Sequence, residues 1–174
     1  DELLLLQLGV ALRRRQLRRH SDAVAINTGG AVDEHIVARF PFELTRHQRG
    51  VIEEIRKDLA STTPMNRLLQ GDVGSGKTVV ALYAMLAAVA SGSQAALMVP
   101  TEILAEQHYF TVCDLLEGSK VKIELLTGTL SVAERKSILA RLEGGEIDLV
   151  IGTHALLSKP VAFKRLGVLV IDEQ

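Results

Sequence analysis

Apolar and polar residues follow two periods along this chain, and from about residue 45 onward the two periods take turns. Short, nearly continuous apolar runs predict strands, while longer stretches with apolar residues three or four positions apart predict helices. The predicted strands are residues 67–70, 95–100, 121–126, 147–152 and 166–171. The predicted helices are residues 49–60, 77–91, 101–116 and 131–145. This alternation predicts an α/β fold with a mostly parallel sheet and helices on both of its faces.

The first 40 residues follow a different pattern from the rest. Residues 1–20 are helical in pattern, whereas residues 21–35 are rich in small and turn-forming residues and predict a linker or loop. We therefore expect a helical linker segment at 1–40 and the main domain at 41–174. Near the start of that domain, Thr45 and Gln48 have the spacing of a capping box, which predicts that a helix begins there.

The composition limits the classes of protein to consider. A chain of 174 residues with 47% hydrophobic residues is long and apolar enough for one packed domain. The net charge of −1 provides no overall basic field, so any contact with nucleic acid has to be local. One cysteine and five scattered histidines give neither a disulfide framework nor a metal-ligand spacing, which favours a reducing, cytoplasmic location. The N-terminal apolar run is too short to cross a bilayer and follows acidic residues, so we expect no membrane span and no signal peptide.

The most specific motif is GDVGSGKT, residues 71–78, which matches G-x-x-x-x-G-K-T between a predicted strand and a predicted helix. A loop of small residues turns its backbone N–H groups toward a phosphate chain, at a helix N-terminus whose dipole favours an anion. The motif predicts binding of ATP with Mg²⁺, in which Lys77 reaches the phosphates and the Thr78 hydroxyl is a metal ligand. The other residues predicted to bind the nucleotide are Gly71, Asp72, Gly74, Ser75 and Gly76.

Two adjacent carboxylates, Asp172 and Glu173, follow the last predicted strand. The carboxyl ends of parallel strands meet at one edge of a sheet, so we expect Asp172 on the same rim as residues 71–78. One carboxylate can then hold the Mg²⁺ shell while the next polarises the attacking water. We therefore predict Lys77, Asp172 and Glu173 as catalytic residues, with Glu173 as the base and Asp172 and Thr78 on the metal. The alternative is a pair of solvated acids at a strand end.

Five segments in this order resemble the motifs of superfamily 2 helicases: GDVGSGKT, VPTEILAEQH, TG at residues 127–128, IGTH and a final DEQ. From residue 40 to the last residue, the sequence of these motifs is most similar to that of the bacterial RecG-like branched-DNA helicases. Transcription-repair coupling translocases and PriA-type helicases have DEEH at the final motif, and the coupling translocases have a bulky residue at the position of Ser75. Gln174 and Ser75 therefore favour the RecG-like branch.

This resemblance implies the first RecA-like domain of an ATP-dependent motor that remodels stalled forks and Holliday junctions. It also implies a chain that stops one residue short of its final motif. The expected partners are branched double-stranded DNA, a second RecA-like domain and an N-terminal wedge domain of a monomeric parent protein. Because half of the hydrolytic site would lie on the second domain, we expect the isolated chain to be nearly inactive.

The resemblance further implies a DNA track and a residue that contacts adenine. The residues of the track are Thr101, Glu102, Thr127, Gly128, Thr153 and His154. Gln48 stands where related motors bind adenine, although its capping-box spacing is an alternative explanation. Thr101 has the alternative role of a helix N-cap, and His154 that of an ordinary loop histidine.

Several features leave alternatives open. The arginine run at residues 13–20 spreads around a helix axis, which favours a solvated face over contact with DNA or another domain. His108 and Cys113 have no chemical partner in the sequence and are assigned to packing or surface. A plain strand-to-helix turn, a small-molecule kinase and a nucleotide-binding switch are competing explanations of the glycine loop. A dinucleotide-binding fingerprint is excluded, because Val79 stands where its third glycine belongs.

Overall fold

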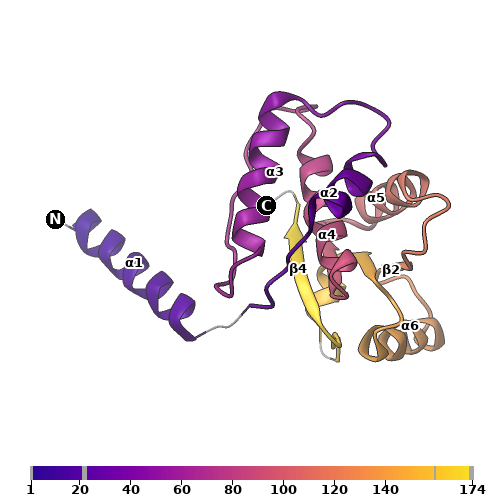
Figure 1. Ribbon diagram of the computed structural model, residues 1–174. Coiled ribbons are helices and arrows are strands. Elements are labelled where there is room, and N and C mark those ends of the chain that lie inside the picture. Colours follow the sequence, from indigo (N-terminus) through magenta and orange to yellow (C-terminus); the bar gives the residue numbers. More distant parts are fainter. Residues whose placement is uncertain (1, 21–22, 159, 173–174) are drawn as a thin grey trace.

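The computed structural model describes residues 2–20, 23–158 and 160–172, and the side chains of residues 14–20 lie outside that description. Its centre is a four-stranded parallel sheet in the order β2-β3-β1-β4 (Figure 1). The strands are β1 (Gln94–Met98), β2 (Ile123–Leu126), β3 (Leu149–Gly152) and β4 (Leu166–Ile171). The predicted α/β class is confirmed, and the unbroken apolar runs of β1 and β3 are fully buried, as expected for strands covered on both faces.

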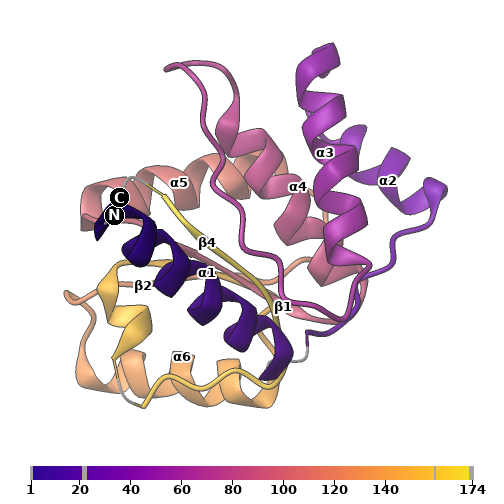
Figure 2. The same cartoon turned by 90° about the vertical axis from the view of Figure 1, so that its left-hand side faces the viewer.

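Helices cover both faces of the sheet (Figure 2). On one face lie α3 (Arg46–Leu59), α4 (Lys77–Ala90) and α5 (Glu102–Leu115); on the other lie α6 (Val132–Gly144) and the short 3₁₀ helix η1 (His154–Leu157). Strand β1 divides its residues between the two cores by simple alternation, with Ala95 and Leu97 on the α4 side and Ala96 and Met98 on the α6 side. The predicted helices at 49–60, 77–91, 101–116 and 131–145 are confirmed within a few residues at each end.

The strands end level with one another at one edge of the sheet. Met98 of β1 pairs with Gly152 of β3 and with Ile171 of β4, while Leu126 of β2 also pairs with Gly152. The segments that follow the four strands therefore emerge side by side at the carboxyl edge. Gly152 is tightly packed there, because a Cβ atom at this position would collide with the carbonyl oxygen of Leu126.

Residues 67–70 do not form the predicted strand. Arg67 instead makes ion pairs with Glu54, at 2.7 Å, and with Asp58 on α3, and these contacts hold the segment against that helix. Of the short apolar run that suggested a buried strand, Leu68 is 83% exposed, and Leu69 is half-buried against the core. The outer edge of β4 has no neighbouring strand in the described part of the chain, and its Leu169 and Ile171 are exposed.

Residues 21–35 also differ from the prediction, because they include the start of a helix, α2 (Gly30–Val37), instead of forming only a loop. The glycines at 29 and 30 suggested a turn, and the eight-residue helix that follows them has one fully buried side chain, Ile36. The Ile26 N–H donates to the carbonyl of Leu59, the last residue of α3, and the Ala23 N–H donates to the carbonyl of Thr62, just after that helix, each at 2.8 Å. Ile26, Ile36 and Phe40 belong to the same core as α3 and α4.

The predicted N-terminal helix is confirmed as α1 (Glu2–His20), which extends away from the rest of the molecule (Figure 1). Its residues 2–13 are all exposed, including a run of leucines. Of the arginine run, only Arg13 has a described side chain, and it is exposed. Within the described ranges no helix combines the length and the hydropathy needed to cross a bilayer.

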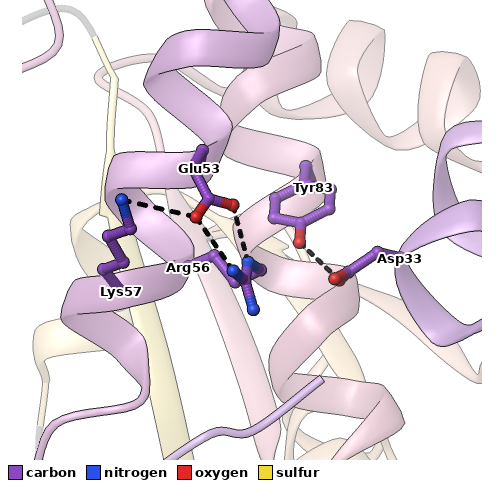
Figure 3. Close-up of polar contacts among 5 residues, drawn as sticks. All are labelled: Asp33, Glu53, Arg56, Lys57 and Tyr83. Atoms are coloured by element: carbon purple, nitrogen blue, oxygen red, sulfur yellow. Dashed lines mark hydrogen bonds and ion pairs between the residues drawn. The ribbon is translucent and has the colours of Figure 1, made fainter. Parts of the chain in front are cut away.

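Figure 3 shows polar contacts on the α4 face of the molecule. The buried Tyr83 hydroxyl of α4 donates a hydrogen bond of 2.6 Å to Asp33 of α2, which joins these two helices. Within α3, Arg56 donates two hydrogen bonds, of 2.8 and 2.9 Å, to Glu53, and the guanidinium lowers the pKa of that carboxyl to about 2. The first bond adds a directional constraint to the packing of α2 on α4, whereas the second lies on the partly exposed surface of α3.

Candidate functional site

The glycine loop of residues 71–76 leads directly into α4. Gly74 and Gly76 have φ angles of 78° and 82°, in the left-handed region that favours glycine, and Gly76 is the N-cap of α4. A Cβ atom on Gly71 would lie 2.6 Å from the Ser75 hydroxyl oxygen, so a larger residue there would require the Ser75 side chain to move. The glycines of the motif therefore suit a tight loop that lies at a helix N-terminus.

Lys77 and Thr78 form the first turn of α4. The Lys77 Nζ donates to the carbonyl oxygens of Gly71, at 2.8 Å, and Asp72, at 2.9 Å, so its ammonium folds back over the loop. Gly76 supplies no side-chain cap for the helix start, which leaves that end suited to an anion. The Lys77 ammonium, the exposed Thr78 and an N-terminus with no side-chain cap fit a phosphate group with Mg²⁺.

Gln48 connects the start of α3 to the glycine loop. Its Oε1 accepts from the Thr45 N–H at 2.8 Å and the Gln48 N–H donates to the Thr45 hydroxyl at 3.2 Å, so the predicted capping box is confirmed. At the same time its Nε2 donates to the Ser75 carbonyl at 2.9 Å. A Cβ atom on Gly76 would collide with this Nε2. Gln48 therefore both caps α3 and contacts the loop, while its predicted contact with adenine stays a prediction.

Asp172 immediately follows β4, and its backbone N–H donates to the Met98 carbonyl at 2.9 Å. A pocket of about 380 Å³ opens beside it and is lined by Lys77, Thr78, His108 and Asp172 among other residues. The structure thus brings together three of the residues predicted for the nucleotide and the metal. Glu173, the predicted base, lies outside the described residues. Across the described part of the chain, no cluster of three or more His, Cys, Asp or Glu side chains is arranged to hold a metal.

His108 of α5 is the residue near this pocket whose position the sequence did not indicate. Its Nε2 lies 3.3 Å from Asp172 Oδ2, and the two side chains come from elements 64 positions apart. The sequence alone predicts a role in packing or at the surface for His108, because nothing in its own helix pairs with it. A contact between the middle of α5 and the end of β4 depends on the order of the strands in the sheet. No short segment of the sequence encodes that order.

The residues predicted for the DNA track lie at the same carboxyl edge. Thr101 follows β1 and its hydroxyl accepts from the Leu104 N–H at 3.3 Å, so its alternative role as the N-cap of α5 is confirmed. Next to it, Glu102 accepts a hydrogen bond of 2.8 Å from the backbone N–H of Gly128, which follows β2. The segments after β1 and β2 are therefore joined across the end of β3, the strand between them in the sheet.

The remaining track residues differ in accessibility. Thr127 is 2% exposed, and its hydroxyl is paired with that of Thr129 at 2.9 Å, so this side chain is buried within the loop and is not available on the surface. Thr153 is the N-cap of η1, and His154 beside it is exposed. Arg135 of α6 donates to Ser158 at 2.7 Å and to the Ala155 carbonyl at 3.3 Å, which fixes η1 from the other side. The carboxyl edge of the sheet therefore carries backbone groups and small polar side chains, and hydrogen bonds from neighbouring residues fix the positions of its loops.

The fold and this edge match a known family of motor proteins. The family model described as DEAD/DEAH box helicase matches residues 45–174, which is most of the chain. The chain belongs to the DEAD/DEAH box helicase family, and its domain is an α/β RecA-like helicase domain. The resemblance to superfamily 2 helicases inferred from the motifs is therefore confirmed.

Within this family the chain is similar to ATP-dependent DNA helicase RecG. It is 46% identical to RecG of Aquifex aeolicus, over 100% of this chain and 22% of that protein. It is 47% identical to RecG of Synechocystis sp., over 100% of this chain and 21% of that protein. A solved structure of RecG bound to a three-way DNA junction has a TM-score of 0.92 and 44% identity, covering 99% of this chain and 24% of that one. The chain thus spans about a fifth to a quarter of the length of these relatives.

Proposed function

We propose that the parent protein is an ATP-dependent motor that remodels branched double-stranded DNA, and that this chain is part of its first motor domain. The observation that carries the proposal is the shared carboxyl edge of the sheet. Lys77, Thr78 and Asp172 line one pocket there, and the segments after β1, β2 and β3 lie beside it. An arrangement of this kind allows a change at a bound phosphate to alter the loops that hold DNA.

In this proposal the chain's own residues bind and orient the nucleotide. Lys77 leaves the carbonyls of Gly71 and Asp72 to contact phosphate oxygens, while the Thr78 hydroxyl and the Asp172 carboxylate hold Mg²⁺. The metal would neutralise phosphate charge when bound. Glu173 orients and deprotonates the attacking water. Arginines from a second RecA-like domain complete the site, and an N-terminal wedge domain selects the junction.

The test is ATP turnover by the full-length parent protein, measured with linear duplex and with forked DNA of matched length. We expect forks to stimulate turnover more strongly than linear duplex. Lys77→Ala should lower turnover by roughly 100-fold, because it removes a charge aimed at the reacting phosphates. The matched control is Lys136→Ala, an exposed lysine on α6, which should behave as wild type.

The two DNA substrates separate the alternatives. Equal stimulation by linear and forked DNA would favour a general duplex translocase of the transcription-repair coupling or PriA type. No stimulation by either would favour a nucleotide-binding switch. In a switch, Glu173→Gln should leave the function largely intact, whereas in a motor it should nearly abolish turnover.

A further inference from the structure

Glu102 joins the two loops of the carboxyl edge that follow β1 and β2 through a hydrogen bond with the backbone of Gly128. Its Oε1 accepts from the Gly128 N–H at 2.8 Å, and a Cβ atom on Gly128 would lie 3.0 Å from the same oxygen. Because β3 lies between β1 and β2, the contact passes over the end of β3, where Gly152 is closely packed against Leu126. It therefore joins the segments after β1 and β2 across the end of the strand that lies between them.

The geometry favours a carboxylate at this position. Glu102 is half-buried in the first turn of α5, where the helix dipole stabilises a negative charge, and Thr101 caps the same turn. A hydrogen bond from an N–H to a carboxylate is about twice as strong as one between neutral groups. Gly128 has no side chain, and its backbone N–H is the group that joins this loop to α5. Within the loop, the buried Thr127 hydroxyl pairs with that of Thr129.

We propose that Glu102 is a positioning residue, which fixes the loop of residues 127–129 on α5 so that both segments can bind one DNA backbone. Its carboxylate would repel a phosphate at close range, and its oxygen is already engaged with Gly128. Glu102 therefore acts through Gly128 and does not itself contact DNA. The inference rests on the proposed function, because it assumes that this edge binds DNA.

Two substitutions separate the hydrogen bond from the charge. Glu102→Gln removes the charge but keeps an Oε1 acceptor for the Gly128 N–H, whereas Glu102→Ala removes both. The matched control is Glu106→Ala, an exposed glutamate one turn further along α5. The full-length parent protein is used for two measurements: the concentration of forked DNA that half-saturates ATP turnover, and hydrogen exchange of the Gly128 amide by mass spectrometry.

We expect Glu102→Ala to raise the half-saturating DNA concentration by about tenfold, the effect of losing one hydrogen bond to a charged group. The Gly128 amide should exchange faster in the same variant. Glu102→Gln should stay within about threefold of wild type, or bind more tightly, because lost repulsion offsets a weaker hydrogen bond. Glu106→Ala should match wild type in both measurements. A weakened response to DNA in the alanine variant, with no such weakening in the glutamine variant, supports positioning through the hydrogen bond.

Other outcomes overturn the inference in distinguishable ways. Unchanged exchange of Gly128 in Glu102→Ala would show that the hydrogen bond does not hold the loop. Faster exchange with an unchanged response to DNA would show that the bond exists but does not position a DNA-binding loop. Equal weakening of DNA binding by both substitutions would show that the charge itself matters. If wild type and Glu106→Ala show no response to DNA, the proposed function fails, and the role of Glu102 fails with it.

Discussion

At the residue scale, Tyr83 shows how a buried polar group links elements of this fold. It is 1% exposed, and its hydroxyl donates to Asp33 of α2. Burial, with a contribution from the Asp33 hydrogen bond, raises the pKa of Tyr83 to about 12. We predict that Tyr83→Phe lowers the free energy of unfolding by about 1–2 kcal/mol at pH 8, because Asp33 loses its donor. Urea unfolding of the chain measures this.

The difference in free energy of unfolding between wild type and Tyr83→Phe should depend on pH in one direction. Since the pKa of Tyr83 is higher in the folded state than in the unfolded state, the neutral phenol stabilises the fold below about pH 10. This contribution is lost as the pH rises toward 12. The gap between wild type and Tyr83→Phe should therefore shrink between pH 10 and 12. A gap that stays constant across this range would contradict the raised pKa. Titration of phenolate absorbance in Tyr109→Phe, which leaves Tyr83 as the sole tyrosine, gives its midpoint directly.

Local contacts of single residues were predictable, and distant ones were not. The spacing of Thr45 and Gln48 predicted a capping box, and both of its hydrogen bonds are present, because a cap depends on four consecutive residues. The contacts of Glu102 with Gly128 and of His108 with Asp172 join residues 26 and 64 positions apart. They exist because the sheet order brings strand ends together, and no periodicity within one segment encodes that order.

At the scale of elements, the start of α3 supports the glycine loop through Gln48. We predict that Gln48→Glu keeps the cap on Thr45 but replaces the donor to the Ser75 carbonyl with an acceptor. In the full-length parent protein this should raise the ATP concentration for half-maximal turnover by roughly tenfold, while the melting temperature changes little. Gln107→Glu, on the exposed surface of α5, is the matched control.

The companion substitution separates the two roles. Thr45→Ala removes the side-chain cap of α3 and should lower stability by about 1 kcal/mol, but it leaves the bond from Gln48 to Ser75 available. If Gln48→Glu and Thr45→Ala affected stability and ATP affinity in the same proportion, Gln48 would act only through the helix. If Gln48→Glu mainly weakens ATP affinity and Thr45→Ala mainly lowers stability, Gln48 influences the glycine loop directly.

The sequence pattern predicted helices and strands correctly where a segment is uniformly buried. It predicted them incorrectly where side-chain contacts with another helix decide the structure of the segment, or where the apolar pattern is short. The apolar helix from Lys77 to Ala90 and the buried strands follow directly from their periods. Residues 67–70 have strand-like side chains, but Arg67 holds them on α3 through Glu54 and Asp58. The helix Gly30–Val37 was missed because two adjacent glycines resemble a turn and its apolar face is short.

At the scale of the whole molecule, the contacts of residues 23–40 predict how much of the N-terminal segment the core requires. Residues 2–13 are exposed, whereas Ile26, Ile36 and Phe40 are buried in the main core. We predict that removing residues 1–22 leaves the melting temperature nearly unchanged and reduces self-association, because it deletes an exposed row of leucines. Calorimetry and sedimentation of residues 23–174 measure both effects.

Removing residues 1–40 should have the opposite effect on stability. Each large apolar side chain lost from the core costs about 1.5–3 kcal/mol, and three of them amount to much of the 5–15 kcal/mol that stabilises a typical domain. Phe40→Ala in the intact chain is a milder control and should cost about 3–5 kcal/mol. If residues 41–174 melted cooperatively at the same temperature as residues 23–174, the domain would begin near residue 41, as its sequence pattern suggests. A large loss would instead make residues 23–40 part of the motor domain. The edge that carries Lys77 and Asp172 would then depend on the packing of a segment well upstream in the sequence.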